Sequence, residues 1–300
     1  MIFAKKNITL LFFQKMSVKK YFSMIKFSHT IFAMPFAFVG YFLGVINIQN
    51  RVGEGLTLLL VALCMIFARS AAMGFNRYID RSIDAKNPRT KNREIPAGKI
   101  KPREALIFVI INAIAFIITC RMLNNLVFYL SPVALLVVLG YSLTKKYTAL
   151  CHFVLGVGLS LAPMGAYLAV TGTFAWLPAM FSLVVLLWSG GFDIIYALQD
   201  KDFDRREQLR SIPALLGLRR ALILSVAVHA LVAILTIVIG IFWNFGKWYA
   251  TGAAIFIILL MYQHLIVKPN DLSRVNAAFF TANGIASVVF SAFIILDLFS

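Results

Sequence analysis

The sequence predicts an all-α integral membrane protein, a bundle of nine transmembrane helices with polar loops capping its cytoplasmic end. Three observations favour this fold class. Hydrophobic residues make up 61% of the 300 residues, and the mean hydropathy is +0.85. Charged residues make up only 14%, against roughly 25% in soluble domains. The apolar residues also fall in runs of about 20, the length at which a helix crosses a bilayer.

Nine such runs, separated by short polar segments, define the expected spans. We expect residues 1–300 to form a single polytopic domain with no added soluble domain. Prolines lie in or at the ends of several spans, where neighbouring helices can satisfy the freed backbone groups. The nine runs are 22–46, 56–75, 105–122, 126–143, 149–170, 176–198, 218–242, 246–267 and 276–297.

The first 20 residues form a basic N-terminal segment with a short apolar patch. No small-residue cleavage site follows the patch, so a signal peptide is not expected. Met1 and Met16 are alternative starting residues. The three cysteines are isolated within apolar runs, which indicates no disulfide framework. The four histidines lack metal-ligand spacing, and His152, near a basic loop, is expected to have a structural role.

The basic residues predict the orientation. The net charge is +17, but the Lys and Arg lie in short gaps between spans, so topology explains them better than a nucleic-acid partner. With the N-terminus in the cytoplasm, 26 of the 29 fall on that side, all except Arg51, Arg121 and Lys247. Lys and Arg are enriched in cytoplasmic loops. We therefore expect a multi-pass protein of the bacterial inner membrane with its N-terminus and active site on the cytoplasmic side.

The 12 acidic residues fall mainly in two groups. Nine of them lie within 80–104 or 193–207. The polar loops 76–104 and 199–217, which belong to these groups, are the predicted active-site loops. Four spans separate the groups, and an even number of crossings returns the chain to the membrane face that it left. Both groups are therefore expected at one end of the bundle.

Within each group, polar residues recur at helical spacing, so each set would occupy one helix face. The first set is Asn76, Asp80 and Asp84, and the second is Asp193, Tyr196, Asp200 and Asp204. Carboxylate oxygens suit hard cations, and proteins usually bind Mg²⁺ through a few carboxylates plus substrate phosphates. We expect the four metal ligands to be Asp80, Asp84, Asp200 and Asp204.

Basic side chains surround these acids in the sequence. Carboxylates alone would repel a diphosphate, whereas metal with Arg and Lys would bind one. The candidate bases are Arg77, Arg81, Arg93, Lys145, Lys146, Lys201 and Arg205. Asn76 can orient a carboxylate or a phosphate oxygen, and Tyr196 can hydrogen-bond a leaving oxygen or face a cation. A diphosphate site beside an apolar bundle indicates an allylic isoprenoid diphosphate as substrate.

The two groups also share a short R-x-I-P segment, at residues 93–96 and 210–213. Each group closes a span and contains Asp-x-x-x-Asp. An even number of spans lies between them, so a duplication would give parallel repeats about an axis along the membrane normal. Internal duplication is a hypothesis at this stage.

Taken together, these segments resemble the UbiA-type membrane-embedded aromatic prenyltransferases, over essentially the whole chain. Residues 76–84 are similar to the family motif N-D-x-x-D-x-x-x-D, and residues 193–204 to its second Asp-rich motif. KNREIPAG is similar to the segment that carries a functional arginine, here Arg93, and residues 141–146 resemble the family's basic loop. Arg77 departs from the pattern, since many members carry Asp there, so Asp80 and Asp84 would carry more of the metal binding.

The resemblance implies Mg²⁺-assisted loss of diphosphate from a polyprenyl diphosphate, then attack of an aromatic ring on the allylic carbon. It implies catalytic roles for the four Asp ligands and Tyr196. The implied substrate-binding residues are Asn76, Arg77, Arg93, Lys145, Lys146 and Asp193. Closure of the 76–104 loop would exclude water. The chain looks most like the branch that prenylates 4-hydroxybenzoate in quinone synthesis, and 1,4-dihydroxy-2-naphthoate and other UbiA-type acceptors are alternatives.

Two other classes of membrane protein that depend on carboxylates are alternatives. A transporter would want ionisable residues near mid-span, whereas these spans are almost free of charge. A CDP-alcohol phosphotransferase would carry D-G-x-x-A-R, and the sequence has no such segment. The prenyltransferase interpretation therefore explains the pattern best.

Overall fold

The computed structural model describes residues 18–26, 32–47 and 54–300. The start-residue question, most of the basic N-terminal segment and Arg51 fall outside the described residues. Within these ranges the regular elements are helices, apart from an isolated bridge between Lys268 and Asp271. The predicted all-α fold class is confirmed.

Eight helical segments of the described chain are long and apolar enough to cross a membrane. One of them, α9, runs on through the short helix η2 (Leu198–Asp200) into α10 (Lys201–Arg206), and another begins as the π-helical turn η3 (Ala277–Ala282). The long helices are α4 (Glu54–Ile79), α6 (Pro102–Leu123), α7 (Asn125–Thr144), α8 (Cys151–Thr171), α9 (Trp176–Ala197), α12 (Leu218–Phe242), α13 (Lys247–Ile266) and α14 (Asn283–Leu298).

The first expected span, 22–46, differs from the prediction. It corresponds to the end of the short helix α2 (Val18–Met24) and to α3 (Met34–Ile46), which has only 13 residues. Pro35 lies in the first turn of α3, where a proline is tolerated and where it favours the start of a helix. The described residues thus hold eight long spans and one shorter apolar helix, not nine full spans.

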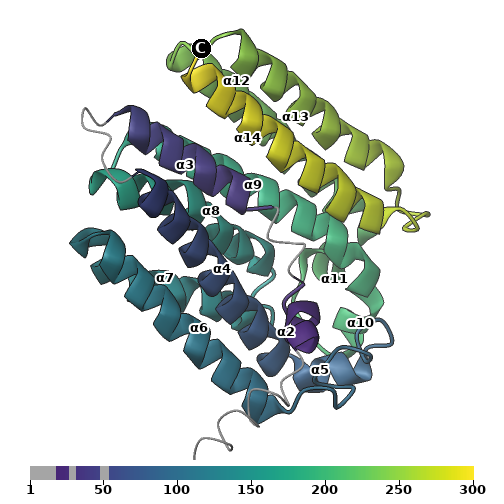
Figure 1. The fold of residues 1–300 in the computed structure, drawn as a ribbon. Coiled ribbons are helices and arrows are strands. Elements are labelled where there is room, and N and C mark those ends of the chain that lie inside the picture. Colours follow the sequence, from purple (N-terminus) through teal and green to yellow (C-terminus); the bar gives the residue numbers. More distant parts are fainter. Residues whose placement is uncertain (1–17, 27–31, 48–53) are drawn as a thin grey trace, which may run out of the picture.

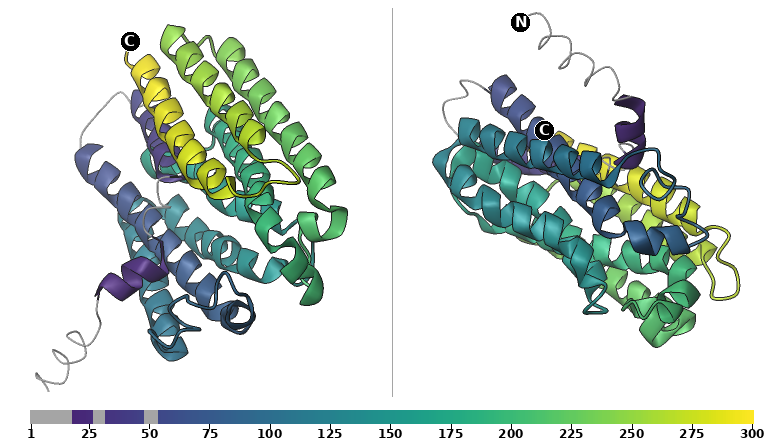
Figure 2. Two further views of the ribbon diagram at one scale, coloured as in Figure 1. Left: turned by 90° about the vertical axis from the view of Figure 1, so that its right-hand side faces the viewer. Right: turned by 90° about the horizontal axis from the view of Figure 1, so that it is seen from below.

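The long helices pack as a bundle around α9 (Figure 1). Helix α8 contacts both α3 and α9, and α12 lies along α9 with α13 and α14 beyond it, as the two further views in Figure 2 also show. Two glycines permit close crossings. A Cβ built at Gly40 would lie 1.9 Å from the carbonyl oxygen of Pro163, and one at Gly156 would lie 2.4 Å from that of Leu186.

The largest core cluster is rich in aromatic side chains, and large apolar side chains also cover the outer faces of the bundle. The largest core cluster includes the fully buried Trp188, Phe181, Phe256 and Phe290, which come from α9, α13 and α14. Large apolar side chains such as Leu136 on α7 are exposed, as expected for helices that face lipid.

The tight α6–α7 hairpin predicted from the sequence is confirmed, with only Asn124 between the two helices. The Asn124 side chain accepts a hydrogen bond from the Val127 N–H at 2.9 Å and so caps α7. Its amide also donates to the carbonyl of Leu168 at 2.8 Å near the end of α8. One polar residue therefore satisfies backbone groups at two helix ends.

The short helices α2, α5 (Arg81–Lys86), α10 and α11 (Ile212–Leu216) gather at one end of the bundle (Figure 1). Both acidic groups lie at this end, so the prediction from the parity of the spans is confirmed. The turns of residues 88–100 link α5 to α6. Helix α2 packs on this loop through Tyr21 and Met24, which join Ile95 and Ile100 in one buried cluster.

Candidate active site

The two acidic groups line one pocket of about 270 Å³. Both predicted sets contribute all of their members to its walls, from the α4–α5 segment on one side and the α9–α10 segment on the other. The lining polar residues are Asn76, Asp80 and Asp84, with Asp193, Tyr196, Asp200 and Asp204. The deeper wall is largely apolar and includes Phe192 and Phe279.

The first set keeps helical spacing although the helix is interrupted at Asp80. The Asp80 N–H donates to the carbonyl of Asn76 at 2.9 Å, and the Asp84 N–H donates to the carbonyl of Asp80 at 2.7 Å. The Asn76 amide donates to Asp80 Oδ2 at 3.1 Å, and Lys145 Nζ lies 2.8 Å from the same oxygen. These residues therefore share one face, as the spacing predicts.

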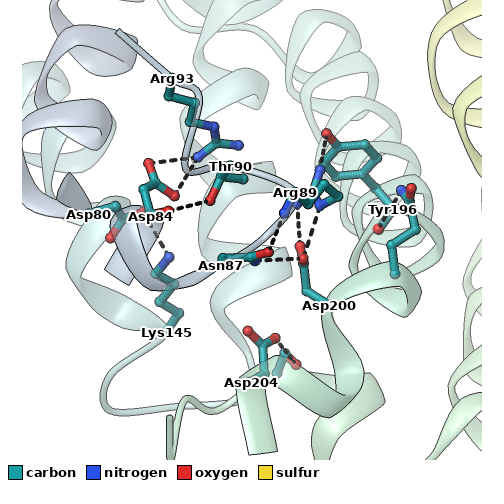
Figure 3. A network of polar contacts seen from close by, with 12 residues as sticks. Asp80, Asp84, Asn87, Arg89, Thr90, Arg93, Lys145, Tyr196, Asp200 and Asp204 are labelled. Carbon is teal, nitrogen blue, oxygen red and sulfur yellow. Dashed lines mark hydrogen bonds and ion pairs between the residues drawn. The ribbon is translucent and has the colours of Figure 1, made fainter. Parts of the chain in front are cut away.

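Asp84 is paired with Arg93, whose Nη1 lies 2.8 and 2.9 Å from the two carboxylate oxygens. Thr90 donates to the main-chain carbonyl of Asp84 at 3.2 Å, which ties the following loop to the same helix end (Figure 3). The loop therefore supplies a base to the acid that precedes it, and the substrate-binding role expected for Arg93 stays a prediction.

Arg89, which the sequence analysis did not single out, joins the two sides of the pocket (Figure 3). Its Nε donates to Asp200 Oδ1 at 3.0 Å, and its Nη2 pairs with Asp200 Oδ2. Its Nη1 donates to the Tyr196 hydroxyl at 2.8 Å, and the guanidinium lies 5.0 Å from the centre of the Tyr196 ring. Asn87 adds a hydrogen bond to Asp200 at 3.0 Å. The loop after the first group thus reaches across to the second group.

The charge of Arg89 is set by this pairing. Burial alone would lower the pKa of Arg89, but hydrogen bonds with Asp200 and Tyr196 and the charge of Asp200 outweigh it and raise that pKa above its ordinary value. The guanidinium therefore remains protonated across the physiological range, ready to bind an anion.

The other two acids of the second group are held by residues 211–212 and by α8. Ser211 Oγ donates to Asp204 Oδ2 at 2.7 Å. His152 Nδ1 lies 2.7 Å from Asp193 Oδ2, and its Nε2 accepts the Ile212 N–H at 3.2 Å. The expectation of a purely structural role for His152 is therefore incomplete. This histidine lines the pocket and holds Asp193 in position.

Three buried polar atoms in the pocket walls have no hydrogen-bond partner among the described residues. They are Asp80 Oδ1, Arg69 Nε and Ser142 Oγ. Arg69 lies three turns before Asp80 on α4, and a charged side chain at this depth is costly without a partner. Both an acidic and a basic residue of the pocket wall, Asp80 and Arg69, therefore have a polar atom that is available to a ligand.

Several predicted bases do not point into the pocket. Lys146 is exposed and is not among the lining residues, unlike Lys145. Arg81 donates to the carbonyl of Tyr78 at 2.6 Å, and Arg205 to that of Ala214 at 2.7 Å. Lys201 pairs with Asp202, whose side chain is 81% exposed. The cationic wall is therefore formed by Arg69, Arg77, Arg89, Arg93 and Lys145.

Within the described part of the chain, no three His, Cys, Asp or Glu side chains converge as a ready coordination shell. Arg89, Arg93 and Lys145 neutralise one carboxylate each, as close carboxylates would otherwise repel one another. The donor set nevertheless fits Mg²⁺, since it consists of carboxylate oxygens, and Asp80 Oδ1 is buried without a partner.

Comparison with known proteins decides the family. The UbiA prenyltransferase family matches residues 33–285. The chain belongs to the UbiA prenyltransferase family. It is 32% identical over 235 residues to 4-hydroxybenzoate octaprenyltransferase of Aeromonas salmonicida (strain A449), covering 78% of this chain and 81% of that protein. The corresponding enzyme of Nitrosospira multiformis is 31% identical over 242 residues, covering 80% and 82%.

Solved UbiA homologues have the same fold. The apo structure of a UbiA homologue from Aeropyrum pernix K1 superimposes with a TM-score of 0.80 at 31% identity, covering 90% of this chain and 98% of that one. A homologue from Archaeoglobus fulgidus bound to GPP and Mg²⁺ gives a TM-score of 0.68 at 20% identity, covering 94% and 100%. This UbiA protein is therefore a membrane prenyltransferase. The alternative interpretation as a transporter is not supported.

Proposed function

We propose that this UbiA protein transfers a polyprenyl group from a polyprenyl diphosphate to the ring of an aromatic acid, in an Mg²⁺-dependent reaction. We propose 4-hydroxybenzoate as the acceptor, in keeping with the names of its bacterial relatives, and respiratory quinone synthesis as the pathway. The positions of Lys and Arg support an active site on the cytoplasmic side of the inner membrane.

One observation carries the proposal. The two Asp groups and three basic side chains, Arg89, Arg93 and Lys145, line one pocket that also has apolar walls. The polar mouth matches a diphosphate, and the apolar part matches a prenyl chain. Asp80, Asp84, Asp200 and Asp204 are the side chains that would hold Mg²⁺. When bound, the metal would supply positive charge that stabilises the diphosphate as it departs.

The basic side chains of the pocket would exchange their carboxylate partners for phosphate oxygens when substrate binds. In this structure Arg89, Arg93 and Lys145 form ion pairs with Asp200, Asp84 and Asp80. Carboxylates engaged by metal would release these cations, which then bind phosphate oxygens through charge-assisted hydrogen bonds. Such bonds strengthen as the C–O bond breaks and the electron pair moves to the diphosphate, so they lower the barrier. The loop that carries Arg89 and Arg93 lines the pocket, and its closure over bound substrate would limit the entry of water.

The Arg69 guanidinium, whose Nε has no hydrogen-bond partner among the described residues, supports an acid as the acceptor. Arg69 faces the pocket from within a span, beside Tyr141 and Ser142, and its Nε has no partner among the described residues. A planar guanidinium binds a carboxylate through paired hydrogen bonds. An aromatic acid held there would keep its ring between the basic wall and the acidic mouth, where the allylic carbon is generated.

Replacement of Arg69 by Gln is expected to raise the KM for the aromatic acid, with the KM for the prenyl donor unchanged. A hydrogen bond to a charged group is worth about 1.5–3 kcal/mol, or roughly a 10- to 150-fold change in binding. The measurement is steady-state kinetics with each substrate varied. Arg121→Gln, at the opposite end of the bundle, is the matched control and should leave both constants unchanged. An unchanged acceptor KM in Arg69→Gln would remove Arg69 from the acceptor site.

The direct test of the function uses the purified protein in proteoliposomes with Mg²⁺, a polyprenyl diphosphate and 4-hydroxybenzoate. We expect prenylated acid and diphosphate in equal amounts, and no product after chelation of the metal. A panel that includes 1,4-dihydroxy-2-naphthoate identifies the preferred acceptor. Failure to prenylate any aromatic acid would contradict the proposal.

A further inference from the structure

The last span does not begin as an ordinary helix. Its first turn, η3, is π-helical over Ala277–Ala282, and α14 follows directly at Asn283. Single π turns within α-helices are rare and occur frequently at functional sites. A side chain bonds to main-chain carbonyls within this turn. The Asn283 amide donates to two of them, the carbonyls of Ala278 at 3.0 Å and Phe279 at 3.3 Å.

Asn283 also joins this turn to two other spans. It is fully buried, and its Oδ1 accepts the indole N–H of Trp188 on α9 at 2.9 Å. Its amide nitrogen lies 3.2 Å from Gln263 Oε1 on α13. An indole N–H can only donate, so the orientation of the Asn283 amide is fixed. The π turn is therefore held from both sides by hydrogen bonds that no lipid could replace.

The turn presents Phe279 to the active-site pocket. The Phe279 ring stacks on the ring of Tyr196, with their centres 4.2 Å apart and their planes at 29°. It meets Phe192 edge-on at 5.2 Å and Phe32 at 5.5 Å. The residues Trp188, Phe192 and Tyr196 follow one another at intervals of four on α9, so the turn packs along one face of that helix.

Tyr196 already accepts a cation on its ring in this structure, because the Arg89 guanidinium lies 5.0 Å from the ring centre. An aromatic face stabilises positive charge through its quadrupole. Phe279 adds a second ring that carries no nucleophilic atom able to capture an allylic cation. Both rings line the same pocket as the acidic residues that would hold the diphosphate.

We propose that Phe279 forms the wall of the prenyl-donor subsite that stabilises the allylic cation together with Tyr196, and that Asn283 is the residue that positions it. The inference rests on the proposed function. In the step concerned, the C–O bond of the donor breaks and diphosphate leaves with the electron pair. The allylic carbon then bonds to an acceptor ring carbon, which loses its proton to water. Phe279 takes no part in the bond changes. Its ring only stabilises the positive charge of the allylic cation.

The first test compares Phe279→Leu with Phe279→Tyr in the full-length protein, using the donor and acceptor that the wild type accepts. Phe279→Leu keeps an apolar side chain but removes the ring, so kcat should fall about 10-fold while the donor KM stays within about twofold. Phe279→Tyr restores a ring and should return kcat to near the wild-type value. Phe293→Leu, on the same span outside the pocket, is the matched control and should have no effect.

The second test asks whether Asn283 acts through Phe279. Asn283→Leu should lower kcat by a similar factor, and the double variant should be no slower than either single variant, since coupled residues are not additive. If Asn283→Leu fails to fold, Trp188→Phe removes the hydrogen bond to Asn283 Oδ1 and serves instead. A wild-type rate in Phe279→Leu, or losses that multiply in the double variant, would overturn the inference. A wild type that prenylates no acceptor would instead overturn the proposed function.

Discussion

Replacement of Asp80 by Asn is expected to lower kcat by about 100- to 1000-fold in a protein that still folds. Asp80 is 2% exposed, and its Oδ2 is engaged by Asn76 and Lys145. Its Oδ1 is buried with no partner among the described residues, so this atom is free for a metal ion. Removal of one group that stabilises transition-state charge commonly costs about 3–4 kcal/mol. The measurement is the rate of prenyl transfer at saturating substrates, with thermal unfolding as a check of folding.

Asp202→Asn is the matched control for this prediction. The substitution is chemically the same and lies in the second acidic group, but the Asp202 side chain is 81% exposed and pairs only with Lys201 in the described part of the chain. We expect wild-type activity. A similar loss in both variants would indicate that net charge, rather than the position of Asp80, controls the rate. Full activity in Asp80→Asn would contradict a metal-binding role.

Replacement of Arg89 by Gln is expected to lower kcat about 100-fold, the second-largest effect. Arg89 is the residue that links Asp200 and Tyr196 to the loop over the pocket. Its loss removes both a cation for the diphosphate and the link that closes the loop, and a charge-stabilising group is worth about 3 kcal/mol. Arg89→Lys should recover little activity, because an ammonium cannot form the paired hydrogen bonds of a guanidinium.

Arg205→Gln provides the control for Arg89. Arg205 also lies at the cytoplasmic end expected from the sequence, but its guanidinium donates to the carbonyl of Ala214 and is not among the residues that line the pocket. We expect kcat and both KM values to stay within about twofold of the wild type. Equal losses at Arg89 and Arg205 would show that the effect is general to surface charge.

The acidic residues of the site were predictable because they are placed at helical intervals. Asp80 and Asp84 stay on one face even though the helix is interrupted between α4 and α5, since the main-chain hydrogen bonds continue through Asp80. The same geometry separates two of the candidate bases from the acids. Arg81 and Lys201 each follow an Asp directly, and a shift of one residue turns a side chain about 100° away from its neighbour on a helix. Neither is among the residues that line the pocket.

Arg89 and Phe279 were not predictable in the same way. Arg89 lies in a loop of turns after Asn87 and Pro88, where no repeating period relates sequence distance to direction in space. Phe279 lies in an apolar run that has the pattern of an ordinary span. The π turn that redirects Phe279 is held by Asn283, whose partners Gln263 and Trp188 lie 20 and 95 residues away from it in the sequence. Within the described residues the first expected span corresponds to the end of α2 and to α3, and hydropathy alone does not register the start of α3 near Pro35.

The most direct measurement is the binding of a prenyl thiodiphosphate, which resists ionisation, to the purified protein with and without Mg²⁺. If the two Asp groups bind the diphosphate through divalent metal, Mg²⁺ should lower the Kd of the analogue at least about 10-fold in the wild type. That gain should be lost in both Asp84→Asn and Asp204→Asn, which lie on opposite sides of the pocket. Binding that is equally tight without Mg²⁺, or a gain that survives the loss of either Asp, would contradict a shared metal-dependent site.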